Sequence, residues 1–282
     1  MGGIIWLASY PKSGNTWVRV FVANLFKNQT EPVDINKLSE FALGDARAEF
    51  YERVSGKPIE DMTDEELHRL RPQVHRLISN LRPDTVFAKT HNASMGFDGV
   101  SLINPEVTAG AIYVIRNPLD VTVSYAHHFA LSIDQTIEAM ASEINHVLTV
   151  GRNVFQVIGS WGGHVRSWTT APGLRCHVLR YEDLSRKPLK AFGGVVKYLG
   201  LPSDSARLRR AIRFSSFETL ARQEKEAGFI EQSKINDQFF RKGRVGDWRN
   251  VLTQAQVEKV IEYHGDVMRD FGYLSKDGKA RS

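Results

Sequence analysis

Residues 10–17 combine the side chains from which a binding site for a small dianion can be built. The stretch reads Tyr-Pro-Lys-Ser-Gly-Asn-Thr-Trp, and it lies where a buried strand is expected to turn into a helix. Backbone N–H groups at the start of a helix, assisted by lysine and hydroxyl donors, bind phosphate or sulfate. The stretch is not a Walker A motif, because G-x-x-x-x-G-K-[ST] is absent. An ordinary strand-to-helix turn is the alternative interpretation.

Residues 87–91 place Lys89 and His91 at the expected end of a second strand. Open α/β sheets bind ligands at the carboxyl ends of their strands, so both side chains are candidates for chemistry. An imidazole with a pKa near 7 suits a general base. A lone histidine is more often structural, and the chain also contains the pair His127 and His128, so these residues alone leave the role open.

Two further segments carry cations suited to phosphate. Residues 113–125 again run from strand to helix, with the planar fork of Arg116 and the hydroxyl of Ser124 two turns along the helix. A structural ion pair between Arg116 and Asp120 is the alternative. Residues 239–250 combine clustered cations with two glycines that let backbone approach an anion, although a solvated basic loop would look the same.

The elements that must position these groups alternate between strand and helix. Residues 4–10 form a continuous apolar run, typical of a central parallel strand covered on both faces. Alternating strands and helices predict an α/β fold, with a single domain built on a central, mostly parallel sheet flanked by helices and with a P-loop-like loop. Further strands are predicted at 85–89, 111–115 and 175–179, and helices at 16–27, after Asn117-Pro118, and at 254–271.

The chain divides into a main domain and a short tail. We assign residues 1–274 to the domain, with 30–82 as a polar, mostly helical insertion or lid. Within it, residues 63–66 resemble a capping box ahead of a helix that ends near residue 81. Residues 275–282 are polar and expected to fray.

Composition narrows the class of protein. A chain of 282 residues with 42% hydrophobic content can bury one large core. No apolar stretch reaches the roughly 18 to 20 residues that span a bilayer, so we expect a soluble cytoplasmic protein without a membrane partner. The single cysteine, Cys176, cannot form an internal disulfide and is expected to be a buried, inert thiol. The net charge of +5 suits nucleic acid, anionic lipid or a small polyanion, but no zinc-finger spacing or RNP-type strand supports nucleic acid.

Together these motifs resemble the cytosolic sulfotransferase family. Its phosphosulfate loop reads Tyr-Pro-Lys-Ser-Gly-Thr-Thr-Trp, and this chain differs at one position, Asn15. The most specific match is Arg-Lys-Gly-x-x-Gly-Asp-Trp at residues 241–248, and the matches follow in family order from residue 6 to about residue 253. The opening Trp-Leu-Ala-Ser-Tyr-Pro-Lys is also similar to bacterial members, including those that sulfate glycopeptide antibiotics.

The resemblance implies transfer of a sulfuryl group from 3′-phosphoadenosine 5′-phosphosulfate (PAPS) to an acceptor hydroxyl or amine, the EC 2.8.2 class, without a metal. It makes His91 the catalytic base, with Lys12 and Lys89 stabilising the developing charge. It also implies that Trp17 and Phe217 sandwich the adenine. The residues that it assigns to the cosubstrate are Lys12, Ser13, Gly14, Asn15, Thr16, Trp17, Arg116, Ser124, Tyr181, Ser215, Phe217, Phe239, Arg241, Lys242 and Gly243.

Several alternatives remain open from the sequence. A P-loop kinase would also use a strand-loop-helix anion site, but its Mg²⁺ ligands and Walker lysine are not found. A nucleotide-responsive or nucleic-acid-binding module has only the charge of +5 in its favour. The acceptor, whether alcohol, phenol, amine or natural-product scaffold, is left open by residues 30–82, 92–108 and 221–238, which match no known pattern.

The oligomeric state rests on one short motif. The family's dimer motif Lys-x-x-x-Thr-Val-x-x-x-Glu is altered at residues 249–258, with Arg249 for the lysine and Gln254 for the valine. A glutamine at the apolar position weakens that contact, so we expect a monomer or a weak homodimer.

Overall fold

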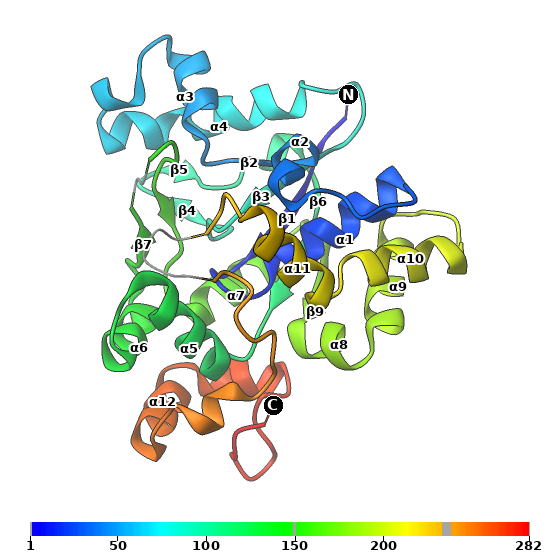
Figure 1. The fold of residues 1–282 in the computed structure, drawn as a ribbon. Coiled ribbons are helices and arrows are strands. Elements are labelled where there is room, and N and C mark those ends of the chain that lie inside the picture. Colours follow the sequence, from blue (N-terminus) through cyan, green and yellow to red (C-terminus); the bar gives the residue numbers. More distant parts are fainter. Residues whose placement is uncertain (1, 149–150, 233–237, 282) are drawn as a thin grey trace.

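The computed structural model describes residues 2–148, 151–232 and 238–281, and a five-stranded sheet lies at its centre (Figure 1). The strand order is β2-β3-β1-β6-β9, and every neighbouring pair is parallel. The strands are β1 Ile4–Ser9, β2 Ala42–Gly44, β3 Val86–Thr90, β6 Thr108–Ile115 and β9 Cys176–Arg180. The predicted fold class is confirmed, and all four predicted strands are present within one to three residues of their expected bounds.

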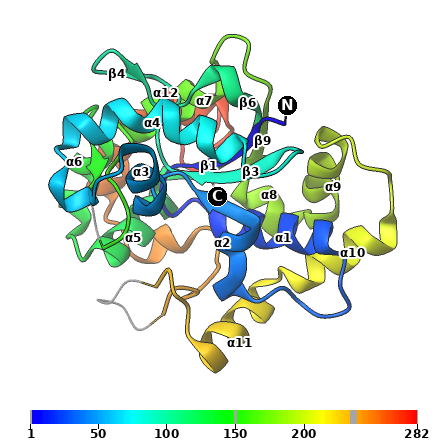
Figure 2. The ribbon, with the colours of Figure 1, turned by 90° about the horizontal axis from the view of Figure 1, so that it is seen from above.

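Alternate side chains of the strands enter two separate cores. Trp6 and Ala8 pack with α4 (Asp64–Ser79), α7 (Trp161–Thr169) and α12 (Gln254–Asp270), whereas Leu7 packs with α1 (Asn15–Lys27), α9 (Pro188–Tyr198) and α10 (Ser205–Phe214). Figure 2 shows α4 and α7 on one side of β1 and β3, and α1 and α10 on the other. Because both faces are covered, β1 and most of β6 are apolar, as the run at the N-terminus predicted, whereas β3 and β9 also carry polar residues. None of the helices in the described ranges is long and apolar enough to span a bilayer.

The helices largely follow the predicted periodicity. The helix expected from residue 16 begins one residue earlier, and the C-terminal helix ends one residue before its expected limit. The α-helices are α1 Asn15–Lys27, α2 Leu38–Phe41, α3 Ala48–Ser55, α4 Asp64–Ser79, α5 Pro118–Phe129, α6 Ile133–Ala141, α7 Trp161–Thr169, α8 Tyr181–Arg186, α9 Pro188–Tyr198, α10 Ser205–Phe214, α11 Phe217–Ala227 and α12 Gln254–Asp270. Short 3₁₀ turns cover Ile35–Lys37, Ile59–Asp61, Pro105–Val107 and Asp247–Asn250, and two small hairpins pair β4 Gly96–Phe97 with β5 Val100–Ser101 and β7 His146–Val147 with β8 Gln156–Val157.

The segment 30–82 contributes to the sheet itself. It is mostly helical, and its capping box at Thr63 and Glu66 starts α4 as predicted. It also contains β2, which pairs with β3 from Ala42 opposite Phe87 to Gly44 opposite Lys89. Sequence analysis missed this strand because three residues directly after a helical turn carry no period of their own. The segment is therefore partly an edge of the central sheet.

The polar tail was expected to fray, but hydrogen bonds hold it against the domain through residue 281. Leu274 and Ala280 form an antiparallel bridge, and the amide of Arg281 donates to the carbonyl of Tyr273 at 2.8 Å. The side chain of Asn117 donates to the carbonyl of Arg281 at 2.6 Å. Asn117 lies far from the tail in sequence, so polarity alone could not reveal this contact.

Cys176 differs slightly from its predicted environment. It is partly buried at the start of β9 rather than fully enclosed. Burial raises the pKa of its thiol to about 12, so the thiolate is absent at neutral pH and the expected inertness is consistent with the structure.

Parallel strands end at one edge of the sheet, and the candidate groups gather there. Loop 10–14 follows β1, Asp45 follows β2, and His91 follows β3. Arg116 and Tyr181 come directly after β6 and β9. The chain thus places one polar or aromatic candidate at the carboxyl end of every strand, the usual position of ligands in open α/β sheets.

Candidate active site

The loop between β1 and α1 offers unsatisfied donors. The backbone turns through positive φ at Lys12 (65°) and Gly14 (106°). A Cβ on Gly14 would lie 2.7 Å from the ring of Tyr181, so only glycine fits there. Ser13 is fully buried, and among the described residues its hydroxyl has no hydrogen-bond partner. Helix α1 also begins without a side-chain cap. An orphan hydroxyl at an uncapped helix start fits an anion.

The side chain of Asn15 is hydrogen-bonded within the protein, and the side chain of Thr16 is buried. The side-chain amide of Asn15 donates to the carbonyl of Leu7 at 2.8 Å and to Oγ of Ser9 at 3.3 Å. This side chain is turned towards β1, so only the backbone of Asn15 is left for the anion. Thr16 is likewise buried, at 7% exposure. The substitution in the phosphosulfate loop therefore ties the loop to its strand.

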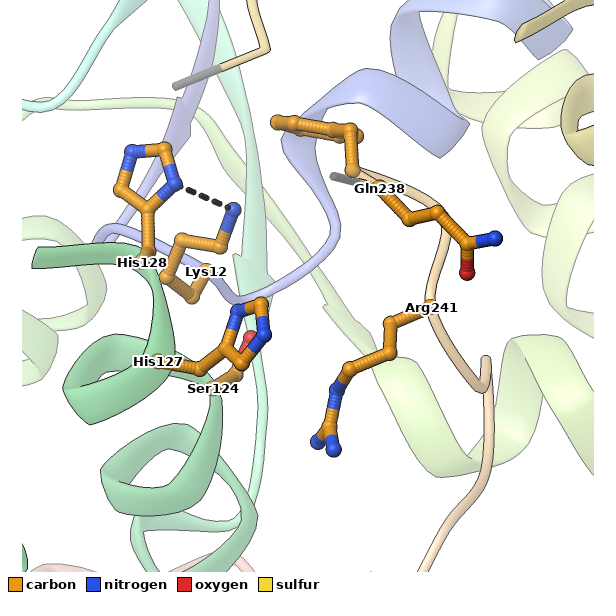
Figure 3. A pocket seen from close by; sticks show the side chains of 7 residues that line it. Lys12, Ser124, His127, His128, Gln238 and Arg241 are labelled. Atoms are coloured by element: carbon orange, nitrogen blue, oxygen red, sulfur yellow. Dashed lines mark hydrogen bonds between the residues drawn. The ribbon is translucent and has the colours of Figure 1, made fainter. Parts of the chain in front are cut away.

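Lys12 lies in a cationic environment. Its Nζ is 4.1 Å from the ring centroid of Phe239 and 3.4 Å from Nδ1 of His128 (Figure 3). Burial, followed by the charges of Lys89 and Arg116, lowers the pKa of Lys12 to about 8. Two neighbouring cations thus disfavour the charged form of Lys12, and an anion bound between them would relieve this repulsion, which favours a polyanionic ligand.

The imidazole of His91 has a defined orientation and tautomer. Its Nδ1 lies 2.8 Å from the backbone carbonyl of Ser9, which can only accept, so Nδ1 carries the proton. Nε2 is then left with its lone pair available. Burial and the nearby charge of Lys89 lower the pKa of His91 to about 3, whereas the sequence-based expectation was a value near 7. His91 is therefore neutral at physiological pH.

A buried network holds the backbone on both sides of His91. Oδ2 of Asp45 accepts from Oγ1 of Thr90 at 2.7 Å and from Nδ2 of Asn92 at 3.0 Å. The amide of Asp45 also donates to the carbonyl of Lys89 at 3.1 Å. Burial opposes the charge of Asp45, but the nearby His75, whose Nε2 lies 3.8 Å from Oδ2, and the hydrogen bond from Thr90 outweigh it and hold the pKa of the carboxyl below its usual value.

Arg116 is held between two backbone carbonyls and an aromatic ring. Nη1 donates to Lys12 and Nη2 to Arg244, both at 3.2 Å, and the guanidinium lies 4.3 Å from the ring centroid of Tyr181. Asp120, the alternative partner considered above, instead accepts from the amides of Gly246 at 2.7 Å and Trp248 at 3.1 Å. These contacts dock the C-terminal basic segment onto α5.

That basic segment meets the first loop at a small pocket. Gly243 has φ 60°, and a Cβ there would lie 2.3 Å from the ring of Phe217. Arg241 and Lys242 both approach the carboxylate of Asp247, at 3.5 and 2.9 Å. The residues lining the pocket (Figure 3) are Lys12, Ser124, His127, His128, Gln238, Phe239 and Arg241. Lys12, Ser124 and Arg241, which lie far apart in sequence, thus converge on one pocket, as the phosphate interpretation requires.

Two of the predicted nucleotide contacts, Ser215 and Trp17, contact other parts of the protein. Ser215 is fully buried, and its hydroxyl donates to the carbonyls of Ala211 at 2.9 Å and Ile212 at 3.1 Å, within its own helix. The ring of Trp17 meets Tyr181 edge-on at 5.4 Å. The adenine sandwich of Trp17 with Phe217 therefore stays a prediction.

Sequence analysis missed two carboxylates that lie beside these cations. Asp45 follows a strand that was not predicted, and Glu231 belongs to a segment without a recognisable motif. Glu231 accepts from Arg19 at 2.7 Å and lies 3.7 Å from Nζ of Lys89. Within the ranges that the structure describes, no group of three or more His, Cys, Asp or Glu side chains could hold a metal ion. The expected acceptor segment 221–238 includes residues 233–237, which lie outside the described residues.

The fold and the cationic strand ends define an α/β protein of the kind that binds phosphorylated small molecules at the edge of its sheet. A family model described as a sulfotransferase domain matches residues 4–272. The chain belongs to the sulfotransferase family, and the protein is an enzyme of this class.

Curated relatives agree over most of the chain. Cytosolic sulfotransferase 5 of Arabidopsis thaliana is 25% identical over 267 residues, which cover 90% of this chain and 76% of the relative. Sulfotransferase 1C2 of Homo sapiens is 27% identical over 266 residues, covering 92% and 80%.

Solved structures share the fold. Mouse sulfotransferase SULT7A1 complexed with PAP has a TM-score of 0.59 at 21% identity, covering 95% of this chain and 85% of that one. Retinol dehydratase in complex with androsterone and inactive cofactor PAP has a TM-score of 0.64 at 19% identity, covering 99% and 82%.

Proposed function

We propose that the protein transfers the sulfuryl group of PAPS to a hydroxyl or amine of a small-molecule acceptor, with His91 as the general base. The observation that carries this proposal is the neutral imidazole of His91, whose Nδ1 is committed to the carbonyl of Ser9 at 2.8 Å. Its free Nε2 lies at the strand end shared with Lys89, beside the cationic loop. A base must be unprotonated before reaction, and this one is.

Transfer would proceed by in-line displacement. The acceptor gives its proton to Nε2 of His91 while its oxygen or nitrogen attacks sulfur. The bond between sulfur and the bridging oxygen breaks, and 3′-phosphoadenosine 5′-phosphate (PAP) leaves with the bonding electrons. Lys12 and Lys89 stabilise the charge that develops on the bridging and sulfuryl oxygens. The anionic cosubstrate itself would raise the pKa of His91 from its low value in the free protein.

The remaining cations would anchor the nucleotide. Arg116 and Ser124 are assigned to the 3′-phosphate, with the segment Arg241 to Gly243 closing over it. Solved relatives named as complexes with PAP support this assignment. Binding energy gained at a remote phosphate can be used to position the sulfuryl group.

Acceptor, location and assembly stay predictions. Relatives named cytosolic sulfotransferases support a cytoplasmic location. In the altered dimer motif, Gln254 donates to Glu258 of its own helix at 2.8 Å, and Arg249 stacks on Trp248 at 4.5 Å. Both substituted side chains thus have partners within the chain, which supports a monomer or a weak homodimer.

The proposed function is tested by incubating the protein with PAPS and a panel of alcohols, phenols and amines, and measuring PAP release together with the sulfated product. We expect turnover that needs an acceptor and that continues in the presence of EDTA. PAPS that stays intact with every acceptor, combined with a linear fall of log affinity for random DNA with log salt, would favour the binding module instead.

A further inference from the structure

Glu231 bridges two cations at the centre of the site. Its oxygens accept from Nη1 of Arg19 at 2.7 and 2.9 Å, and Oε2 lies 3.7 Å from Nζ of Lys89. The side chain of Arg19 is 2% exposed, whereas those of Lys89 and Glu231 are 26% and 27% exposed. A buried guanidinium without a carboxylate is strongly destabilising, so Arg19 fixes where this carboxylate sits.

The carboxylate also favours the charged form of Lys89. Burial lowers the pKa of Lys89, and the charge of Glu231 is the largest influence that opposes it. Burial alone would raise the pKa of Glu231, but Lys89 and Arg19 outweigh it and lower it to about 2, so the carboxylate stays charged. The charged and titratable groups around Lys89 are Glu231, Arg19, Asp45, Lys12, His91 and His128.

A second carboxylate anchors the same part of the chain without touching Lys89. Glu224, on α11, accepts from the amides of Phe239 at 2.5 Å and Phe240 at 2.9 Å. Glu231 and Glu224 thus both hold the connection between α11 and the basic segment. Of the two, Glu231 is the one within ion-pair distance of Lys89, which makes Glu224 a matched control.

We propose that Glu231 is a positioning residue for sulfuryl transfer: by bridging Arg19 and Lys89, it keeps the ammonium of Lys89 charged and in place beside His91. The inference rests on the transfer role proposed above for Lys89. An uncharged or displaced amine could not stabilise the charge that develops on the sulfuryl oxygens. The opposite possibility is that Glu231 competes with the sulfuryl group for Lys89, and it predicts effects of the opposite sign.

The test is the pH dependence of kcat/KM for PAPS, which reports ionisations of the free enzyme. Glu231→Gln removes a negative charge, so Lys89 should lose its proton at lower pH. We expect the alkaline limb to move to lower pH by at least about one unit, and kcat to fall. Glu224→Gln should move the limb clearly less. Equal shifts in the two variants would contradict the proposal, because anchoring of the segment would then explain both.

Lys89→Arg separates the lysine of interest from Lys12, since arginine stays protonated throughout. In that background only the influence of Glu231 on Lys12 is left, so Glu231→Gln should shift the limb clearly less than it does with Lys89 in place. A lower KM for PAPS and a higher kcat/KM in Glu231→Gln alone would establish competition and overturn the proposal.

Two controls keep the outcome interpretable. If Glu231→Gln does not fold, Glu231→Asp keeps the charge with a shorter reach, and unchanged kcat and limb in that variant would contradict a positioning role. Wild-type protein without PAPS turnover would refute the proposed function itself, and full turnover in Lys89→Ala would refute the transfer role of Lys89 on which the inference rests. An active wild type with an unmoved limb in Glu231→Gln would refute only the role of Glu231.

Discussion

The ends of β3 and β6 meet the same cationic loop but in different surroundings. At the β3 end, His91 and Lys89 are groups whose charge depends on pH, and burial lowers the pKa of both. At the β6 end, Arg116 carries a permanent charge and rests on Tyr181 and on two backbone carbonyls. The difference suggests that the two ends have separate roles: the β3 end transfers the proton and stabilises developing charge, and the β6 end binds a fixed anion.

Carboxylates behind the two ends repeat the contrast. Asp45 supports the backbone around His91 through Thr90 and Asn92. Glu182, fully buried behind Arg116, accepts from the amide of Asn117 and from the hydroxyl of Tyr273, both at 3.0 Å. Each end therefore has its own buried carboxylate, and the two can be removed separately.

The largest expected effect is at the β3 end. His91→Ala removes the base, so kcat should fall about 10²-fold or more while PAP affinity stays within a few-fold of wild type. Steady-state turnover and calorimetric titration with PAP measure the two quantities. A variant that turns over normally, or one that no longer binds PAP, would break the separation between the two ends.

Arg116→Ala should give the converse result. Loss of the proposed charge-assisted phosphate contact is expected to weaken PAP by about 10- to 100-fold, with kcat at saturating PAPS little changed. Arg180→Ala is the matched control. Like Arg116, Arg180 lies at the carboxyl end of a strand, and its guanidinium lies 4.7 Å from the ring centroid of a tyrosine, Tyr273. Unlike Arg116, it also lies 4.0 Å from the carboxylate of Asp183. Equal loss of PAP affinity in both variants would argue for general destabilisation.

Removing either of the two supporting carboxylates should separate turnover from PAP affinity in the same way, but with smaller effects. We expect Asp45→Asn to lower kcat by about tenfold through misplacement of His91, with PAP affinity retained. Glu182→Gln should instead weaken PAP by a few-fold. Thermal unfolding of both variants provides the control for folding, and identical kinetic profiles would contradict the comparison.

The smallest expected effect is on the pH dependence of kcat/KM for PAPS. Lys12 has a pKa of about 8, so its charged form is lost as pH rises through that value, and kcat/KM for PAPS should decline above it. His91 has a pKa of about 3 and stays neutral above it, so we expect no acid limb from His91 between pH 5 and 7. A limb near pH 6.5 that disappears in His91→Ala would show that His91 titrates like an ordinary histidine.

The sequence predicted the groups that follow long, apolar strands. Lys12, His91 and Arg116 each stand in a motif with a strand before it, and all three meet at the sheet edge. Residues whose placement depends on tertiary contacts could not be predicted. Asp45 follows a strand of three residues, and Glu231 gains its position from Arg19, more than 200 residues away.

Two motif residues also behave differently from their sequence assignment. The side-chain amide of Asn15 donates to the carbonyl of Leu7, and the hydroxyl of Ser215 donates to the carbonyl of Ala211. A short polar side chain can bond to nearby backbone as easily as to a ligand, and a motif does not distinguish the two. The low pKa of His91 was equally hidden, because burial and the charge of Lys89 are properties of the folded chain.

The most direct test of the central claim is calorimetric titration of the wild-type protein with PAP, with ADP as a control that carries the same number of phosphates. We predict micromolar binding of PAP that drops sharply for ADP, because we propose that Arg116, Ser124 and the basic segment hold the 3′-phosphate. Equal affinity for the two nucleotides would contradict a dedicated 3′-phosphate site and with it the assignment of PAPS as the sulfuryl donor.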